Sequence, residues 1–171
     1  MGHQEHEQQA RVAGPGRLAC GILTISDTRT PATDTSGATI RALLTHAGHD
    51  VVRYTVVRDE PSAIIALVRA YVAEGVKLLI TNGGTGIARR DCTIEALDAL
   101  LEKRIPGFGE LFRMLSYQEI GAAAMLSRAT AGVYAGTLIF CLPGSTAAVT
   151  LGLEALIIPQ VAHLVWETIR Q

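Results

Sequence analysis

The sequence predicts an α/β protein in which helices cover both faces of a mainly parallel sheet. Short apolar runs, typical of buried strands, alternate along the chain with longer segments whose apolar residues recur at helical spacing. Parallel strands require such helical crossovers, and strands that are buried on both faces form nearly continuous apolar runs. No internal repeat, low-complexity tract or long linker interrupts the alternation. We therefore expect a single α/β domain.

Two strand–helix units make up the first part of the predicted sheet. The apolar run Leu18–Ile25 is typical of a buried strand, and the helix predicted over Gly37–Ala47 ends before Gly48. The second strand is predicted over Val51–Val57. The helix predicted over Pro61–Ala73 begins with proline, which suits the first turn because its nitrogen has no hydrogen to leave unpaired.

The middle of the chain predicts a third strand and two further helices. Val76–Ile80 is an apolar run typical of a buried strand, and Thr93–Glu102 carries apolar residues at helical spacing. After the break at Pro106-Gly107, a helix is predicted over Phe108–Glu119.

The end of the chain predicts a hairpin and a long helix. The hairpin joins Ala131–Tyr134 to Thr137–Leu142 through Ala135-Gly136, and the helix runs from Ser145 to Arg170 with an interruption near Pro159. The apolar stretch inside this helix contains interruptions that favour a bent helix of a soluble protein over a membrane span, namely Glu154, Pro159, Gln160 and His163.

Composition limits the classes of partner. The chain has 171 residues, 18% of them charged, and its formal net charge is −1, which argues against a general nucleic-acid binder.

Residues 1–17 are polar and lack the apolar core of a signal peptide. We expect them to form a mobile arm, which leaves 18–171 as the single domain. The three cysteines are widely spaced without a CxxC pair, which favours reduced thiols in the cytoplasm. Low charge with positive mean hydropathy also suggests an oligomer.

The segment 81–91 is the most informative part of the chain. Gly83, Gly84 and Gly86 follow a predicted strand, and their backbone N–H groups could close on an oxyanion because no side chain intervenes. Two arginines and Asp91 come next, before a predicted helix. This order of residue types predicts a phosphate or nucleotide site with a carboxylate available for a divalent cation.

Three further polar segments follow predicted strands. They begin at Ser26, Asp59 and Pro143, and parallel strands place all four segments beyond the carboxyl edge of one sheet, where open α/β sheets bind ligands. The absence of GxxxxGK[ST] and of GxGxxG after the first strand excludes the standard P-loop and dinucleotide folds. The candidate binding residues are Ser26, Asp27, Asn82, Gly83, Gly84, Thr85, Gly86, Arg90, Ser127, Arg128, Pro143, Gly144 and Ser145, and the candidate catalytic and metal-binding residues are Asp59 and Asp91.

Each candidate also has a purely structural interpretation. Asp59 and Asp91 could cap the helices that follow them, and the glycines could serve only a tight turn. Ser145 suits the N-cap of the last helix, and Arg29 could be an ordinary solvated charge. Cys92 lies beside Asp91, but packing is favoured over nucleophilic chemistry because no base is evident.

Several motifs, in order, resemble the MoaB/MogA family of molybdenum cofactor biosynthesis proteins, and the resemblance extends from about Leu18 to His163. Asn82 and the Pro-Gly-Ser-Thr segment are more similar to the MoaB branch than to MogA. The motifs are Ile25-Ser26-Asp27-Thr28-Arg29, Asp34-Thr35-Ser36-Gly37, Asn82-Gly83-Gly84-Thr85-Gly86, Arg90-Asp91, Ile105-Pro106-Gly107-Phe108-Gly109-Glu110, Leu126-Ser127-Arg128-Ala129 and Leu142-Pro143-Gly144-Ser145.

The resemblance implies a three-layer α/β/α molybdopterin-binding domain that transfers AMP from Mg-ATP to the terminal phosphate of molybdopterin. It implies Mg²⁺ as cofactor, a homotrimer or hexamer, and a molybdate-inserting enzyme as partner. The net charge and the interrupted apolar stretch separately argue against nucleic acid and membrane as partners. Asp59 and Asp91 match the family's two carboxylates. Two alternatives stay open: a non-catalytic molybdopterin carrier, and a different nucleotide-phosphate enzyme, whose relatives typically carry additional domains.

Overall fold

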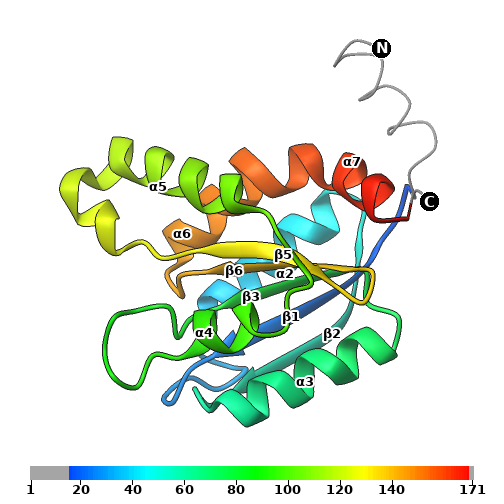
Figure 1. Ribbon diagram of the computed structural model, residues 1–171, viewed down its shortest axis with the longest axis horizontal. Helices are drawn as coiled ribbons and strands as arrows, with labels where there is room; N and C mark the ends of the chain where they lie inside the picture. Colours follow the sequence, from blue (N-terminus) through cyan, green and yellow to red (C-terminus); the bar gives the residue numbers. More distant parts are fainter. Residues whose placement is uncertain (1–15, 170–171) are drawn as a thin grey trace.

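The computed structural model describes residues 16–169, which form one six-stranded sheet between two layers of helices (Figure 1). The strand order is β2-β1-β3-β6-β5-β4. This architecture confirms the predicted three-layer α/β/α fold with a mostly parallel sheet. Of the arm predicted over residues 1–17, all but the last two residues lie outside the described part of the chain.

Four strands of the sheet run parallel. They are β1 (Ala19–Ile25), β2 (Asp50–Val57), β3 (Leu78–Asn82) and β6 (Thr137–Leu142). The first, third and sixth strands are buried almost throughout, whereas β2 is an edge strand and is largely half-exposed. The carboxyl ends of all four therefore lie on one edge of the sheet, as the sequence predicts.

The other two strands are antiparallel. β5 (Thr130–Tyr134) pairs with β6 through the predicted hairpin, and β4 (Lys103–Arg104) pairs with β5 at the far edge. The hairpin turn at Ala135 and Gly136 has φ values of 46° and 74°. Positive φ at both central residues matches the right-handed twist of the flanking strands.

Helices cover the sheet on both faces (Figure 1). One face packs against α2 (Thr35–His46), α5 (Pro106–Ile120) and the long C-terminal helical run. The opposite face packs against α3 (Pro61–Ala73) and α4 (Thr93–Asp98). The C-terminal run consists of α6 (Thr146–Leu151), a π-helical segment η2 (Gly152–Ile157) and α7 (Ile158–Ile169).

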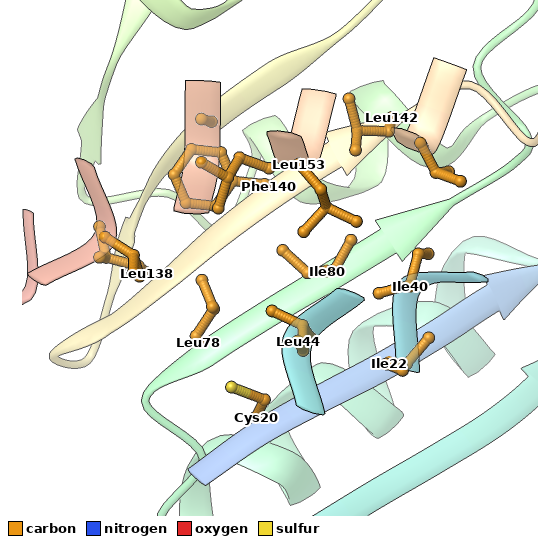
Figure 2. Close-up of a cluster of buried hydrophobic side chains, with 14 of the residues drawn as sticks. Cys20, Ile22, Ile40, Leu44, Leu78, Ile80, Leu138, Phe140, Leu142 and Leu153 are labelled. Carbon is orange, nitrogen blue, oxygen red and sulfur yellow. The ribbon is translucent and has the colours of Figure 1, made fainter. Parts of the chain in front are cut away.

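Alternating side chains of each strand fill two separate cores. In β3, Leu78 and Ile80 join the core beneath α2 and the C-terminal run, whereas Leu79 between them joins the core beneath α3 and α4. Figure 2 shows the first of these cores, in which Ile40 and Leu44 of α2 lie against the sheet. The period of two along each strand thus divides the apolar residues between the two helical layers.

Some predicted boundaries are wrong. β3 lies over residues 78–82 rather than 76–80, because the polar side chains of Thr81 and Asn82 are buried and bonded internally. α4 ends at Asp98, earlier than predicted, and the chain then forms β4. The two-residue strand β4 and the 3₁₀ helix η1 (Gly121–Leu126) have no counterpart in the prediction.

The interruption of the last helix takes the form of the π-helical segment and precedes Pro159 instead of centring on it. Proline has no N–H to donate, so the preceding turn can widen without losing a bond at that position. The run Thr146–Thr168 is long and apolar enough to cross a membrane by length and composition alone. One side of it nevertheless contributes Val149, Leu153, Ile157, Val161 and Val165 to the core, which is the behaviour of a core helix.

The burial pattern predicts a large contrast between two valine positions. Val68 of α3 is 0% exposed and Val52 of β2 is 52% exposed. Truncating Val68→Ala should lower the free energy of unfolding by about 2 kcal/mol, since methyl groups are lost from a packed core. Val52→Ala should lower the free energy of unfolding by less than half as much as Val68→Ala. Urea denaturation of both variants measures the difference, and equal losses would contradict the assigned burial.

Candidate functional site

The structure brings the four predicted segments together at the carboxyl edge of the sheet. Ser26 N donates to Val57 O at 2.8 Å, and Gly83 N donates to Leu142 O at 3.0 Å. These two backbone bonds join the segment after β1 to the end of β2, and the segment after β3 to the end of β6. A single site at this edge is therefore possible, as the sequence predicts.

The glycines at this edge allow backbones to approach closely. Gly83 has φ 98°, and a Cβ there would lie 2.2 Å from the carbonyl oxygen of Ile25. A Cβ on Gly144 would lie 3.1 Å from the Cα of Gly83. The loop over Gly83–Gly86 is therefore pressed between the segments after β1 and β6, and no side chain could be added at Gly83 without moving the backbone.

Asp59 packs against the glycine loop and is 6% exposed. Its Oδ1 accepts from the Cys92 N–H at 3.4 Å and from Thr93 Oγ1 at 3.4 Å, so Asp59 satisfies the N-terminus of α4 from another loop. A Cβ on Gly84 would lie 2.4 Å from Asp59 Oδ2. The prediction that Asp59 caps its own helix is wrong, because the N-cap of α3 is Glu60.

Asp91 lies at the other end of the same loop. Its Oδ2 accepts from the Ala88 N–H at 3.0 Å, and a Cβ on Gly86 would lie 2.4 Å from that oxygen. Asp91 does not cap α4 either, since the N-cap there is Cys92. The two carboxylates thus contact the glycine loop at Gly84 and at Gly86.

Both carboxylates have an oxygen for which the described residues supply no hydrogen-bond donor, Oδ2 of Asp59 and Oδ1 of Asp91. Over residues 16–169 there is no cluster of three or more His, Cys, Asp or Glu side chains that could hold a metal ion. Mg²⁺ does not need one, because it commonly takes one or two carboxylates and completes its shell with water and phosphate oxygens. The donor set fits that cation.

The Cys92 thiol packs against Asp59, with Sγ 2.9 Å from Oδ1. Burial and the hydrogen bond to Asp59 raise the pKa of Cys92 to about 12. The thiol therefore stays protonated at neutral pH and donates to the carboxylate, which supports packing over nucleophilic chemistry.

Arg90 joins three of the loops. Its Nε and Nη2 donate to the two carboxylate oxygens of Asp27 at 2.9 and 3.1 Å, and Nη2 lies 2.9 Å from Glu60 Oε1. The hydrogen bond and charge of Arg90 lower the pKa of Asp27. Two carboxylates balance this one arginine, so Arg90 connects the loops more than it attracts an anion.

Arg128 contacts the glycine loop at Gly86. Its Nη1 donates to the carbonyl of Gly86 at 2.9 Å, and its Nη2 pairs with Glu95 of α4. Ser127 lies beside it at the end of η1. Thr85, within the loop, is 6% exposed. Arg128 therefore contacts the backbone of the glycine loop, and its predicted role in ligand binding stays a prediction.

Asn82 has an internal position that the sequence does not reveal. It is 0% exposed, its Nδ2 donates to Thr24 Oγ1 at 2.9 Å, and its Oδ1 lies 2.8 Å from Ser36 Oγ. The side chain thereby ties the end of β3 to the first turn of α2. Its predicted role as a ligand contact stays untested, and the geometry gives it a supporting role.

Asp34 and Ser36 complete this buried network, and sequence reasoning named neither as a site residue. Asp34 caps α2 by accepting from the Gly37 N–H at 3.0 Å, and it accepts from Tyr54 Oη at 2.8 Å. Ser36 Oγ also lies 3.0 Å from Asp34 Oδ1. The order Asp-Thr-Ser-Gly at the start of an apolar helix is the sequence signal that could have identified Asp34 as a helix cap.

Arg29 is not the ordinary solvated charge that the sequence suggests. Its Nη1 donates to Ser36 Oγ at 2.7 Å and lies 3.6 Å from Asp34 Oδ1. Its backbone N–H donates to Ser26 Oγ at 3.1 Å. The guanidinium is thus fixed to the buried network, with the side chain 31% exposed.

Two helix N-termini meet beside these residues. Ser145 caps α6, as predicted, by accepting from the Ala148 N–H at 3.1 Å. Thr35 Oγ1 of α2 lies 3.3 Å from Thr146 Oγ1 of α6. Pro143 and Gly144 form the short segment that leads from β6 into this cap. The partial positive charge of the α2 N-terminus is already met by the Asp34 carboxylate that caps it, so these two N-termini alone do not make an anion site.

Comparison with known proteins shows the family. Residues 21–163 match the family model described as a probable molybdopterin binding domain. Molybdenum cofactor biosynthesis protein B of Bacillus cereus is 49% identical over 173 residues, covering 100% of each chain. A crystal structure of a molybdenum cofactor biosynthesis protein B superimposes with a TM-score of 0.88 at 51% identity, covering 92% of this chain and 99% of that one. The tungsten cofactor synthesizing protein MoaB from Pyrococcus furiosus has a TM-score of 0.83 at 37% identity, covering 91% and 99%.

The environment of Asp34 predicts a loss of stability in acid. Burial alone would raise its pKa, but hydrogen bonds from Thr24, the Gly37 N–H, Tyr54 and Ser36 outweigh burial and lower it. A lowered pKa means that the ionised carboxyl stabilises the fold above about pH 4, and this contribution is lost as the pH falls through the folded-state pKa. Asp34→Asn should be less stable than wild type at pH 7 and should lose less on acidification. Thermal unfolding between pH 3 and pH 7 measures this, and parallel curves would contradict it.

Proposed function

Because this chain belongs to the MoaB/MogA family of molybdopterin-binding proteins, in the MoaB branch, we propose that it transfers AMP from Mg-ATP to the terminal phosphate of molybdopterin. A phosphate oxygen of the pterin attacks the α-phosphorus of ATP. A new P–O bond forms there, the bond to the β-phosphate breaks, and pyrophosphate leaves. The product is adenylylated molybdopterin.

The observation that carries the proposal is the contact of two carboxylates with one glycine loop. Asp59 lies against Gly84 and Asp91 against Gly86, and each has an oxygen that receives no hydrogen bond from residues 16–169. A backbone loop that can hold phosphate oxygens therefore lies beside the carboxylates that would hold Mg²⁺. Nucleotidyl transfer requires phosphate-binding groups and magnesium ligands that lie next to one another.

This reaction asks the protein for alignment and charge neutralisation more than for covalent chemistry. Mg²⁺, bound with ATP, supplies positive charge to the phosphate oxygens. The N–H groups of Gly84 and Gly86 would orient the phosphates, since that of Gly83 already donates to Leu142 O, and Arg128 would hold the loop in place through Gly86 and Glu95. We expect Ser26, Asp27 and the segment Pro143–Ser145, which follow strands at the same edge, to contact the pterin or the adenosine.

The non-catalytic alternative also rests on a specific observation. Oδ1 of Asp59 accepts from Cys92 and Thr93 at the start of α4, so the fold itself has a use for this carboxylate. A protein that binds and delivers molybdopterin without adenylylating it would retain Asp59 for that reason. The two functions differ in whether AMP is transferred.

The cellular setting follows from the same proposal. Cys20 and Cys141 are buried free thiols inside strands, which suits the reducing cytoplasm. The product would pass to a molybdate-inserting enzyme. A homo-oligomer, trimer or hexamer, is supported by exposed apolar side chains along α5 and η1, between 47% and 76% exposed: Leu111, Met114, Tyr117, Ile120, Met125 and Leu126.

Replacing Asp91 tests the enzymatic proposal. Asp91→Asn should retain folding and molybdopterin binding but lose at least about 100-fold in turnover, because a neutral amide is a poor magnesium ligand. The assay follows adenylyl-molybdopterin and pyrophosphate with and without Mg²⁺. Asp50→Asn, at the start of β2, is the matched control and should match wild type.

Near-wild-type turnover by Asp91→Asn would remove Asp91 from the mechanism. Tight molybdopterin binding by the wild-type chain, without any metal-dependent product, would instead support the carrier.

A charge placed in the apolar stripe of α5 tests the oligomer. Met114 and the edge-strand residue Val52 are similarly exposed, at 51% and 52%. Met114→Glu should dissociate the oligomer at micromolar concentration, because burying a carboxylate in an interface is costly. Val52→Glu should leave the assembly unchanged. Sedimentation velocity measures both, and a monomeric wild-type chain would contradict the assembly.

A further inference from the structure

Arg29 differs from Arg90 and Arg128 in how closely its guanidinium is paired with a carboxylate. Arg90 is paired with two carboxylates, Asp27 and Glu60, and Arg128 is paired with Glu95. The nearest carboxylate of Arg29 is Asp34, whose two oxygens already accept from Gly37 N and Tyr54. Among the described residues, Arg29 thus has no carboxylate contact shorter than 3.6 Å, whereas Arg90 contacts Asp27 and Glu60 at 2.9 Å and Arg128 forms a close pair with Glu95.

The Arg29 guanidinium also has N–H donors that are not hydrogen-bonded to the described residues. Among the described residues it makes one side-chain hydrogen bond, from Nη1 to Ser36 Oγ at 2.7 Å. Its Nε and Nη2 therefore have no protein acceptor in that part of the chain. Arginine presents its donors as a planar fork that matches two oxygens of a phosphate.

The position of this fork is fixed before any ligand arrives. Ser26 Oγ holds the Arg29 backbone, and Ser36 Oγ holds the side chain. Ser36 is in turn 0% exposed and lies 2.8 Å from Asn82 Oδ1 at the end of β3. A donor that is ordered in advance loses little conformational freedom on binding, which favours affinity.

Arg29 lies beside the start of the last helix. A Cβ on Gly144 would be 3.6 Å from Arg29 Nη1, so the guanidinium lies against the segment that enters α6. The N-termini of α2 and α6 meet here through Thr35 and Thr146. The Arg29 guanidinium thus lies against Gly144 at the entry to α6, whereas Asp59 and Asp91 contact Gly84 and Gly86.

We infer that Arg29 binds a phosphate group of one of the two substrates, at a metal-free anion site distinct from the carboxylates at Gly84 and Gly86. This inference rests on the proposed function for the identity of those substrates. Asn82, Ser36 and Asp34 act as positioning residues that hold Arg29 in place. The phosphate belongs either to molybdopterin or to ATP, and binding each ligand separately distinguishes the two.

The test measures equilibrium binding of molybdopterin and of α,β-methylene-ATP to Arg29→Gln by dialysis. The affinity for one of the two ligands should fall about 10- to 100-fold, as expected when one or two hydrogen bonds to a charged phosphate are lost. The affected ligand identifies the phosphate. Arg29→Lys should fall between wild type and Arg29→Gln, because lysine keeps the charge without the fork.

Arg69→Gln on α3 is the matched control, because it removes the same charge from an exposed position and should leave both affinities unchanged. If Arg29→Gln binds both ligands as tightly as wild type, the inference is overturned. A lower melting temperature in such a variant would show that Arg29 has a structural role instead. Because the readout is binding, arginine-dependent molybdopterin affinity without AMP transfer would uphold this inference while the adenylyltransferase proposal fails. A wild-type chain that binds neither ligand would overturn both.

Discussion

The site depends on how closely three backbone segments approach one another at the carboxyl edge of the sheet. Gly83 lies against the carbonyl of Ile25 on one side and against Gly144 on the other. Parallel pairing of β1, β3 and β6 imposes this approach, because it brings three strand ends to the same edge at the spacing of a hydrogen-bonded ladder. The carboxylates, the arginines and the helix N-termini are arranged around this contact.

Charges at the edge are organised in two ways. Arg90 and Arg128 form exposed or half-exposed pairs that bridge loops, and pairs of this kind contribute little to stability in water. Asp34 is different, because it is buried and several hydrogen bonds offset the cost of burying its charge. The buried network gives the edge a rigid side at α2, while the bridged loops form its more accessible side.

The fold was largely predictable from the sequence because the period of two in each strand and the helical spacing between strands are local signals. The shared edge was predictable as well, since parallel pairing follows from the alternation. The positions of Asp59 and Asn82 were not, because each bonds to a segment distant in sequence, Asp59 to the start of α4 and Asn82 to α2. The two-residue strand β4 is too short to leave a pattern. Assignment of individual loop residues to ligands stays a prediction.

The π-helical segment has a consequence for the register of the last helix. The residues that this helix contributes to the core, from Val149 to Val165, recur at intervals of four. In a straight α-helix, four residues overshoot one turn by about 40°, so such a stripe would wind away from the sheet over its length. The wider turn at Gly152–Ile157 takes up part of that excess rotation. The C-terminal run can thus keep one side packed on the sheet from the carboxyl edge at Ser145 to the opposite end of the strands.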